Sequence, residues 1–299
     1  MVQIQRHDYH KAHCYQYDIR LKNLKTDLIQ ARLTRTDTQK LKVSDFKFSY
    51  VDKSDQITCK RIKHFIEKHE WLGKMPHRPT HRFIATYKGQ IAGVIVMATP
   101  NTFSHLLGKE NRDKEKLISR GACISWSPKN LGSALLMFSI RWMVKHTNFR
   151  FFTGYSDTEA KELGTIYQAC NFTYLGKNSG GRAEYFDPFN PEKEWFSDRQ
   201  FRRVSQYKKY AKDLKTTWLL EYGSRNGMNW HNVPDDIELR LRQASRNHQR
   251  RCLKRKLPKK HKYVYILGRT KSETKRLKNR FKKNNPKTIN LAYPKVRGE

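Results

Sequence analysis

The chain has 299 residues and carries 62 Lys and Arg against 27 Asp and Glu, which gives a formal net charge of +35. Such an excess of like charge repels itself in a folded protein and persists where a polyanion neutralises it, so we expect nucleic acid as the partner. No apolar run approaches the ~20 residues of a membrane-spanning helix and no signal-peptide core follows Met1, so we expect a soluble, cytoplasmic protein without a membrane partner.

The first 45 residues are basic and contain few apolar clusters, so we predict a basic N-terminal arm or flanking helix over residues 1–45. A weak helical pattern runs through Leu21, Leu24, Leu28 and Leu33. From residue 46 the period changes, because Phe46, Phe48 and Tyr50 alternate with polar residues as in a half-buried strand. A core is therefore predicted over residues 46–190.

Within this core the apolar pattern predicts alternating elements. After a helix over 59–71, two strands over 82–87 and 91–97 flank a turn with Gly89, which is typical of a hairpin. The pattern continues with a strand over 118–126, a helix over 131–146, a strand over 151–155, a helix over 158–170 and a strand over 172–175. This order predicts an α/β (α+β) fold with a mixed central sheet flanked by helices.

Residues 191–299 form a basic C-terminal extension in this interpretation. A helix is predicted over 236–257 and a strand over 263–266, and because aromatic residues and a strand pattern interrupt the charge, we predict a phosphate-contacting module. The alternative is a solvated basic tail. The predicted phosphate ligands are Arg246, Arg250, Arg251, Lys254, Arg255, Lys256, Lys259 and Lys260.

A short loop between the predicted strand 118–126 and the helix 131–146 is the first candidate for binding chemistry. Backbone N–H groups at a helix N-terminus lack intrahelical acceptors, so a turn of small residues there can hold a pyrophosphate. The loop residues are Lys129, Asn130, Leu131, Gly132, Ser133 and Ala134. Their spacing resembles the Q/R-x-x-G-x-G/A loop by which GNAT acyltransferases hold acetyl-CoA, and the order of predicted elements matches a GNAT core. The alternative is a glycine that merely lies near a helix start.

A closer resemblance lies downstream, in the segments Phe152-Thr-Gly-Tyr-Ser-Asp157 and Gly164-Thr-Ile-Tyr-Gln-Ala-Cys-Asn-Phe-Thr-Tyr-Leu-Gly176. The chain resembles the Mom proteins of bacteriophages, which are GNAT-like enzymes that convert adenine in DNA to an N6-carbamoylmethyl form and thereby protect phage DNA from host restriction. The likeness covers roughly residues 65–176, with similar pieces at 262–268 and 293–295. It implies acetyl-CoA as cofactor, double-stranded DNA as partner and the host cytoplasm as location.

Carried over residue by residue, the resemblance points to His69, Arg120, Asn130, Ser133, Tyr155, Asp157, Tyr167 and Gln168. Among these we take Asp157, His69, Arg120 and Tyr155 as the catalytic candidates. Asp157 would act as or orient a general base, since adenine N6 must lose a proton as it attacks, although an N-cap role fits equally. Arg120 suits a phosphate or carboxylate but also a surface ion pair, and His69 suits a proton carrier, a metal ligand or a structural residue.

Reaching an exocyclic base nitrogen implies base flipping or a single-stranded substrate, with aromatic rings stacked on the extruded base. The candidates are Tyr155, Tyr167, Trp126 and Trp71, each of which is also a candidate core residue.

Metal ligands are less well supported by the sequence. His7, His10, His13 and Cys14, or His77 with His81, match no known zinc spacing, so no metal site is predicted. The resemblance leaves iron as a possible cofactor, although ligand spacing does not support it. The five cysteines are odd in number and form no CxxC pair, so no disulfide framework is expected and Cys123 and Cys170 are interpreted as core residues.

Two other functions stay open at this point. The first is a GNAT N-acetyltransferase that acts on aminoacyl-tRNA, a ribosomal protein or a hypermodified base. The second is a nucleic-acid-binding protein without enzymatic activity. The oligomeric state and the preferred DNA sequence are not predicted.

Overall fold

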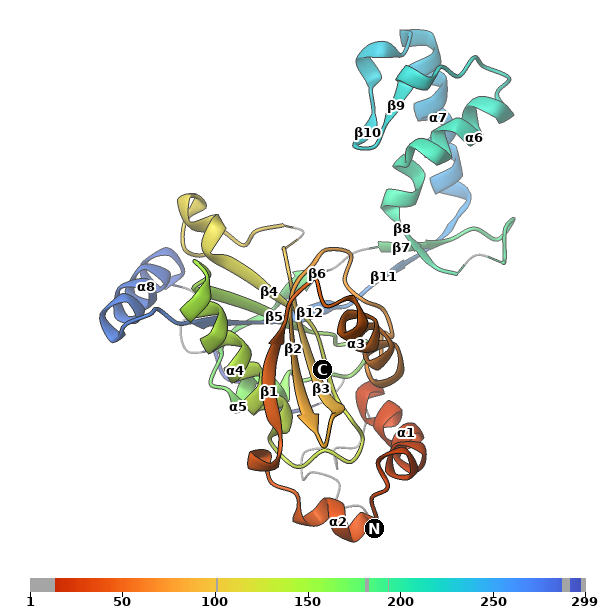
Figure 1. Ribbon diagram of the computed structural model, residues 1–299. Helices are drawn as coiled ribbons and strands as arrows, with labels where there is room; N and C mark the ends of the chain where they lie inside the picture. Colours follow the sequence, from red (N-terminus) through yellow and green to blue (C-terminus); the bar gives the residue numbers. More distant parts are fainter. Residues whose placement is uncertain (1–13, 101, 181–182, 193, 287–290, 297–299) are drawn as a thin grey trace. The chain divides into compact units, whose positions relative to one another are not determined.

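The structure is a computed structural model that describes residues 14–296 apart from 101, 181–182, 193 and 287–290 (Figure 1). It consists of two compact units, Met1–Ser179 with Lys260–Glu299 and Gly180–Lys259. This division differs from the arm, core and extension expected from composition. Both the N-terminal segment and the last part of the chain belong to the first unit.

A seven-stranded sheet in the order β1-β2-β3-β4-β5-β12-β6 forms the centre of the first unit. Its strands are β1 Lys47–Val51, β2 Pro79–Tyr87, β3 Gln90–Ala98, β4 Glu115–Cys123, β5 Phe151–Ser156, β6 Thr173–Gly180 and β12 Lys259–Ile266. Strands β1 to β4 pair antiparallel, β4 and β5 pair parallel, and β12 is antiparallel to β5. The predicted mixed α/β fold is therefore confirmed.

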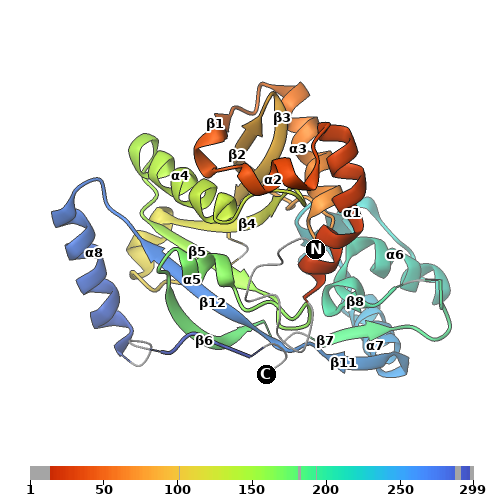
Figure 2. The ribbon, with the colours of Figure 1, turned by 90° about the horizontal axis from the view of Figure 1, so that it is seen from below.

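Helices cover both faces of this sheet, with α4 on one face and α1 and α3 on the other (Figures 1 and 2). The helices of the first unit are α1 Tyr15–Ala31, α2 Arg35–Lys40, α3 Gln56–His69, α4 Leu131–His146, α5 Thr165–Ala169 and α8 Lys271–Asn284, with short 3₁₀ turns at Val43–Asp45 and Lys109–Lys114. Helix α4 has the predicted bounds, and Leu135, Leu136, Ile140 and Met143 on its inner side are fully buried. They pack against the sheet and form the main core.

Helix α1 is a packed part of the first unit. Gln16 Nε2 donates to the carbonyl of His69 at 2.6 Å, and Asn23 Nδ2 donates to the carbonyl of Lys68 at 2.7 Å. These bonds satisfy carbonyls of the last turn of α3, which have no donor inside that helix. Helix α1 therefore packs against α3, within the segment for which an arm or a flanking helix was expected.

The helix expected over 158–170 is much shorter in the structure. It is reduced to α5, because Lys161 (φ 57°) and Gly164 (φ 66°) adopt left-handed conformations that interrupt it. Tyr263 Oη donates to the carbonyl of Leu163 at 2.5 Å and so ties this irregular segment to β12. Long-range contacts thus override the helical pattern of residues 158–164.

The second unit contains α6 Val204–Asp213, α7 Asp235–Arg251 and a three-stranded sheet in the order β11-β7-β8. The strands of this sheet are β7 Ala183–Phe186, β8 Phe196–Ser197 and β11 Leu253–Lys256. A separate hairpin joins β9 Gly223–Ser224 and β10 Gly227–Met228, and 3₁₀ turns lie at Asp198–Arg202, Leu220–Tyr222 and Trp230–Asn232. The helix predicted over 236–257 ends at Arg251, since residues 253–256 pair antiparallel with β7. Tyr207, Tyr210 and Leu241 lie in the core of this unit.

In the described part of the chain, no helix combines the length and the apolar character that crossing a membrane requires.

Candidate active site

Strands β4 and β5 separate towards their carboxyl ends. Their parallel pairing runs from Glu115–Phe151 to Leu117–Thr153, whereas β4 continues to Cys123 and β5 to Ser156. The remaining residues of β4 pair with β3 on the other side, as far as Gly93–Cys123. In α/β folds, ligands bind outside the carboxyl ends of neighbouring parallel strands. We refer to this region as the parted ends of β4 and β5.

The N-terminus of α4 follows directly after β4 and supplies the predicted cofactor loop. Asn130, the N-cap residue, adopts a left-handed conformation (φ 70°), and Lys129 and Asn130 are both exposed. The amides of Gly132 and Ser133 belong to the first turn, whose N–H groups have no intrahelical acceptor. An exposed lysine beside such amides is the arrangement that binds a diphosphate.

Other residues of this loop have structural contacts. Leu131 is fully buried, the Ser133 hydroxyl donates to the carbonyl of Asn130 at 3.0 Å, and the Ala134 amide donates to the same carbonyl at 2.9 Å. A Cβ atom at Gly132 would lie 3.4 Å from Cys123 Sγ and 3.4 Å from Ile166 Cδ1. The glycine therefore lets α4 lie close to both β4 and α5.

Asp157, the predicted general base, comes directly after β5 and is ion-paired. Its Oδ2 lies 2.5 Å from Lys260 Nζ, and its Oδ1 accepts a hydrogen bond from the Glu159 amide at 3.0 Å. Both carboxylate oxygens thus have partners within the first unit. This arrangement orders the turn that follows β5.

Glu162 is the more suitable proton acceptor of this turn, and the sequence pattern did not single it out. Its Oε2 accepts a hydrogen bond from the Asp157 amide at 3.0 Å. Burial raises the pKa of Glu162 to about 7, and the negative charges of Glu70 and Asp157 act in the same direction. A carboxylate with a pKa near 7 can take up and release protons at neutral pH.

Glu70 and Arg120 approach from the β4 side of the parted ends. Glu70 is buried just after α3, and burial raises the pKa of its carboxyl group. Arg120 Nε lies 3.9 Å from Glu70 Oε1 and donates to the carbonyl of Lys74 at 2.7 Å. Arg120 therefore holds the segment after α3 against β4. These contacts favour the alternative interpretation of Arg120 as an ion-pair residue.

His69 belongs to a buried polar cluster on α1, α3 and the segment after β4. Its Nδ1 lies 3.5 Å from Oδ2 of Asp27, a fully buried carboxylate that also contacts Lys68 Nζ and the Ser125 hydroxyl, both at 2.6 Å. Burial lowers the pKa of His69 to about 4, so its imidazole is neutral at pH 7. The cluster connects three distant segments, which favours the structural interpretation of His69.

The predicted aromatic residues divide into two groups. Tyr167 and Trp126 are buried, Tyr167 stacks on Tyr263 with ring centroids 5.2 Å apart, and Trp126 packs against Phe46. Tyr155 and Trp71 are half-buried. The core interpretation therefore holds for the first pair, whereas the second pair retains accessible ring surface.

Tyr167 and Gln168, on α5, complete the set carried over from the resemblance. The Tyr167 ring packs so closely on β5 that a Cβ at Gly154 would lie 2.5 Å from it. The charge of Glu162 raises the pKa of the Tyr167 hydroxyl, in addition to the larger effect of burial. Gln168 Nε2 donates to the carbonyl of Leu163 at 2.8 Å. Helix α5 thus contacts Gly132 through Ile166 and lies within electrostatic range of Glu162.

The candidate metal ligands are dispersed among the described residues. His7, His10 and His13 lie outside them, Cys14 is buried, His77 is exposed, and burial lowers the pKa of His81 to about 4. The second unit brings ligand atoms of Asp187, His248 and Cys252 within 4.8 Å of one another. However, Asp187 Oδ2 already contacts His248 Nε2 at 3.0 Å and Arg251 Nη2 at 3.1 Å, and an arginine at this oxygen disfavours a cation.

The predicted phosphate ligands lie in two different places. Lys260 is in the first unit, paired with Asp157, and the others are in the second unit. There, Arg251 pairs with Asp187 and Arg255 pairs with Glu184. Arg246, Arg250, Lys254, Lys256 and Lys259 are exposed. Phosphate contacts at these residues remain a prediction.

Comparison with known proteins gives one family. The sequence profile described as the Mom protein family matches residues 45–287. No curated protein matches the sequence significantly.

Several solved acetyltransferase structures overlap the fold weakly. The ribosomal-protein-S18-alanine N-acetyltransferase from Escherichia coli is 10% identical to this chain. The structural alignment covers 75% of this chain and 96% of that protein, with a TM-score of 0.34. A GNAT family acetyltransferase from Elizabethkingia anophelis with acetyl-CoA bound is 10% identical, with coverages of 75% and 99% and a TM-score of 0.32. The ribosomal-protein-S5-alanine acetyltransferase from Vibrio fischeri is 14% identical, with coverages of 44% and 81% and a TM-score of 0.33. Scores this low do not indicate a shared substrate or reaction.

Proposed function

Because this chain belongs to the Mom protein family, we propose that it modifies adenine in double-stranded DNA at N6 by transfer of an acyl group from an acyl-CoA: the N6–acyl bond forms, the thioester bond breaks, and coenzyme A leaves as the thiol. The carbamoylmethyl form that the family resemblance implies is attached through a methylene carbon and contains an amide nitrogen, so it requires a nitrogen donor and a further step. Such a modification would protect the DNA of a phage from host restriction. The observation that carries the proposal is the position of Glu162, a carboxylate with a pKa of about 7 next to the parted ends of β4 and β5.

The N-terminus of α4 fits the diphosphate of an acyl-CoA. Lys129 is exposed, Asn130 turns the chain in a left-handed conformation, and the first-turn amides of Gly132 and Ser133 are available by helix geometry. We propose that these four residues hold the diphosphate. Bound there, the coenzyme would supply an activated acyl group.

Glu162 is proposed as the general base. The exocyclic nitrogen of adenine is a weak nucleophile, so a group that accepts its proton during attack accelerates the reaction. Glu162 is suited to this because burial and the charges of Glu70 and Asp157 strengthen its proton affinity. Asp157 is a positioning residue in this scheme, since its amide binds Glu162 Oε2 at 3.0 Å while Lys260 neutralises its own carboxylate.

The base must leave the double helix to reach this site. Flipped bases stack between aromatic or apolar side chains. Tyr155 on β5 and Trp71 after α3 are the two half-buried aromatic residues of the predicted set. We propose that one or both contact the extruded adenine.

Mass spectrometry of nucleosides tests the proposal directly. DNA from cells that express the chain is expected to contain an adenine nucleoside heavier by the added group. Glu162→Gln keeps the size of the side chain but removes the proton acceptor, and we expect it to lower adduct formation by roughly 10²-fold or more. Glu159→Gln, an exposed residue of the same turn, is the matched control and should leave the adduct level unchanged.

Other outcomes would identify the competing functions. Acetylation of RNA or of a ribosomal protein, with unmodified DNA, would replace the proposal by an N-acetyltransferase. DNA binding without any modified nucleoside or protein would indicate a binding protein. Full adduct formation by the Glu162→Gln variant would exclude Glu162 as the base.

A further inference from the structure

A cationic groove lies along α8, away from the parted ends of β4 and β5. Its volume is about 590 Å³, and its lining includes Arg269 and Asn279 as well as four lysines of α8. These lysines are Lys271, Lys275, Lys278 and Lys282, and we call them the α8 lysine stripe.

The stripe follows one face of the helix. Its members are spaced by four, three and four residues, so their side chains point to the same side. At ~1.5 Å of rise per residue the stripe is ~16 Å long. All four lysines are exposed, whereas Leu277 and Phe281 on another face of α8 are buried against Phe151, Leu175 and Val264.

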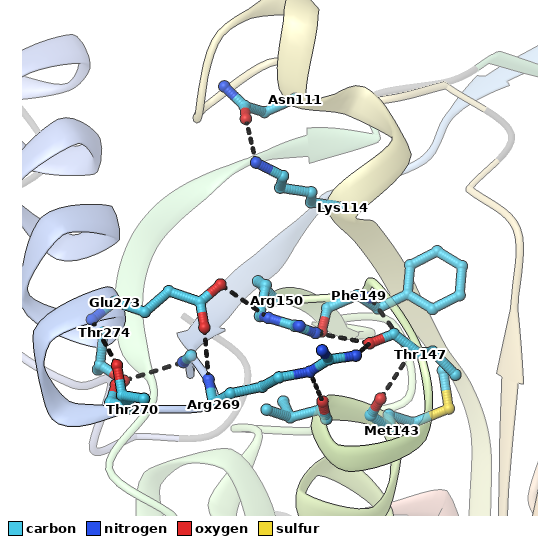
Figure 3. Close-up of polar contacts among 12 residues, drawn as sticks. Asn111, Lys114, Met143, Thr147, Phe149, Arg150, Arg269, Thr270, Glu273 and Thr274 are labelled. Carbon is cyan, nitrogen blue, oxygen red and sulfur yellow. Dashed lines mark hydrogen bonds and ion pairs between the residues drawn. The ribbon is translucent and has the colours of Figure 1, made fainter.

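Helix α8 is anchored so that it presents this face rigidly. Arg150 Nε donates to Glu273 Oε1 at 3.0 Å, and the Arg269 amide donates to Glu273 Oε2 at 2.6 Å (Figure 3). The guanidinium of Arg269 contacts the carbonyl of Val144 at 3.3 Å, at the end of α4. Glu273 is the only acidic residue of α8, and these contacts engage both of its oxygens. It is therefore not available to neutralise the stripe.

The stripe carries unbalanced charge. Within the described residues, no acidic side chain forms an ion pair with any of its four lysines, although Arg280 of the same helix pairs with Glu110. Like charges three or four residues apart destabilise a helix by about 0.2–0.5 kcal/mol per pair. Such an arrangement is favourable where an external polyanion neutralises it.

We infer that the α8 lysine stripe contacts the phosphate backbone of duplex DNA. This inference rests on the proposed DNA substrate and adds the surface of the first unit that holds it. A membrane surface fits less well, because the apolar residues Leu277 and Phe281 that an interfacial helix would insert are already buried in the core. A small anion would need only one or two of the four lysines.

The position of α8 suits a contact that fixes the register of the duplex. Phe281 of α8 packs on Phe151, the first residue of β5, with ring centroids 6.2 Å apart, whereas Asp157 and Glu162 follow the opposite end of this strand. A six-residue strand spans ~20 Å, a length of several base pairs, so the stripe lies far from the end of β5 that Asp157 and Glu162 follow. Phosphate contacts at such a distance orient the DNA without reading its sequence.

A salt titration of duplex binding tests the inference. Each phosphate contact contributes ~0.9 to the slope of log affinity against log salt concentration, so Lys→Gln at all four stripe positions should reduce the slope by ~3.6. The matched control replaces Lys22, Lys25, Lys53 and Lys60, four exposed lysines of the same unit, and removes the same net charge. Circular dichroism verifies that both variants are folded.

The outcomes are decisive in either direction. The inference is supported if the slope of log affinity against log salt concentration becomes less steep in the stripe variant and stays near the wild-type value in the control. Equal slopes in the two variants would overturn it, because net charge alone would then explain binding. Wild-type protein that binds duplex DNA but yields no modified adenine would refute the proposed function and leave the stripe result valid.

Discussion

The Asp157 amide donates to Glu162 Oε2 at 3.0 Å, while the Asp157 carboxylate is paired with Lys260 Nζ at 2.5 Å. One residue thus orients the other and is itself neutralised. In the same turn Glu162 has a pKa near 7, because its carboxyl group is desolvated and lies near other negative charges. The two neighbouring acids therefore differ: Asp157 is held in an ion pair, whereas Glu162, with its raised pKa, is the residue that we propose as the general base.

The pH dependence of adduct formation should follow Glu162. A general base acts in its ionised form, so the single-turnover rate should rise as pH increases through about 7 and level off above it. Rates measured with saturating duplex and acyl-CoA between pH ~5.5 and ~8.5 give the profile. Glu162→Gln should abolish this rise, and a variant that keeps an inflection near pH 7 would assign the proton to another group.

Neutralising the two charges around Glu162 should shift the profile in opposite directions. Glu70 raises the pKa of Glu162 and Lys260 lowers it, so Glu70→Gln should move the inflection to lower pH and Lys260→Gln to higher pH. The inflection of each variant is measured against wild-type protein under the same conditions. Shifts of the same sign in both variants would contradict the arrangement. Opposite shifts are expected only if the two charges act on Glu162 electrostatically, because a general structural disturbance would not depend on the sign of the charge removed.

Removing Asp27 should destabilise the first unit strongly. Its carboxylate is fully buried and contacts Lys68 and Ser125 at 2.6 Å, so Asp27→Ala would leave both partners without their acceptor. Breaking a buried ion pair costs about 3–5 kcal/mol. Urea unfolding measures the loss, and Asp18→Ala on the exposed side of the same helix should cost less than ~1 kcal/mol. Similar losses in both variants would show that Asp27 has no special role.

Acid should destabilise the protein partly through His81. Burial lowers its pKa in the folded state to about 4, whereas in the unfolded chain the pKa lies near the usual histidine value of about 6.5. As pH falls from about 6.5 towards 4, the unfolded state therefore binds the proton more readily and stability decreases. His81→Phe preserves a ring near Tyr50 and Trp142 and should make the free energy of unfolding less dependent on pH in this window. An unchanged dependence would exclude His81 as a contributor.

Local patterns in the sequence determine much of the fold. The helix Leu131–His146 and the hairpin of β2 and β3 follow from apolar periodicity and from the glycine at the turn, which depend only on neighbouring residues. The loop at Lys129–Ala134 was likewise correctly expected between a strand and a helix, and the net charge of +35 predicts a polyanionic partner.

The identity of the proposed base was decided by tertiary structure. Glu162 was expected in the first turns of a helix, but left-handed residues at 161 and 164 place it in a turn beside Asp157. Its proton affinity depends on burial and on Glu70, which comes from a distant segment after α3. Similarly, β12 enters the central sheet next to β5, although its sequence lies among basic residues near the end of the chain.

The physical reason is the range of the interactions involved. Helix and strand periodicity reflects contacts between residues close in sequence, so it can be predicted from the chain alone. The pKa of a carboxyl group and the pairing partner of a strand depend on desolvation, charges and hydrogen bonds from segments that only folding brings together. The sequence therefore determined the elements and the family of this protein, whereas the fold determined which carboxyl group of the turn after β5 has a raised pKa and, among the described residues, which lysines of α8 lack an acidic partner.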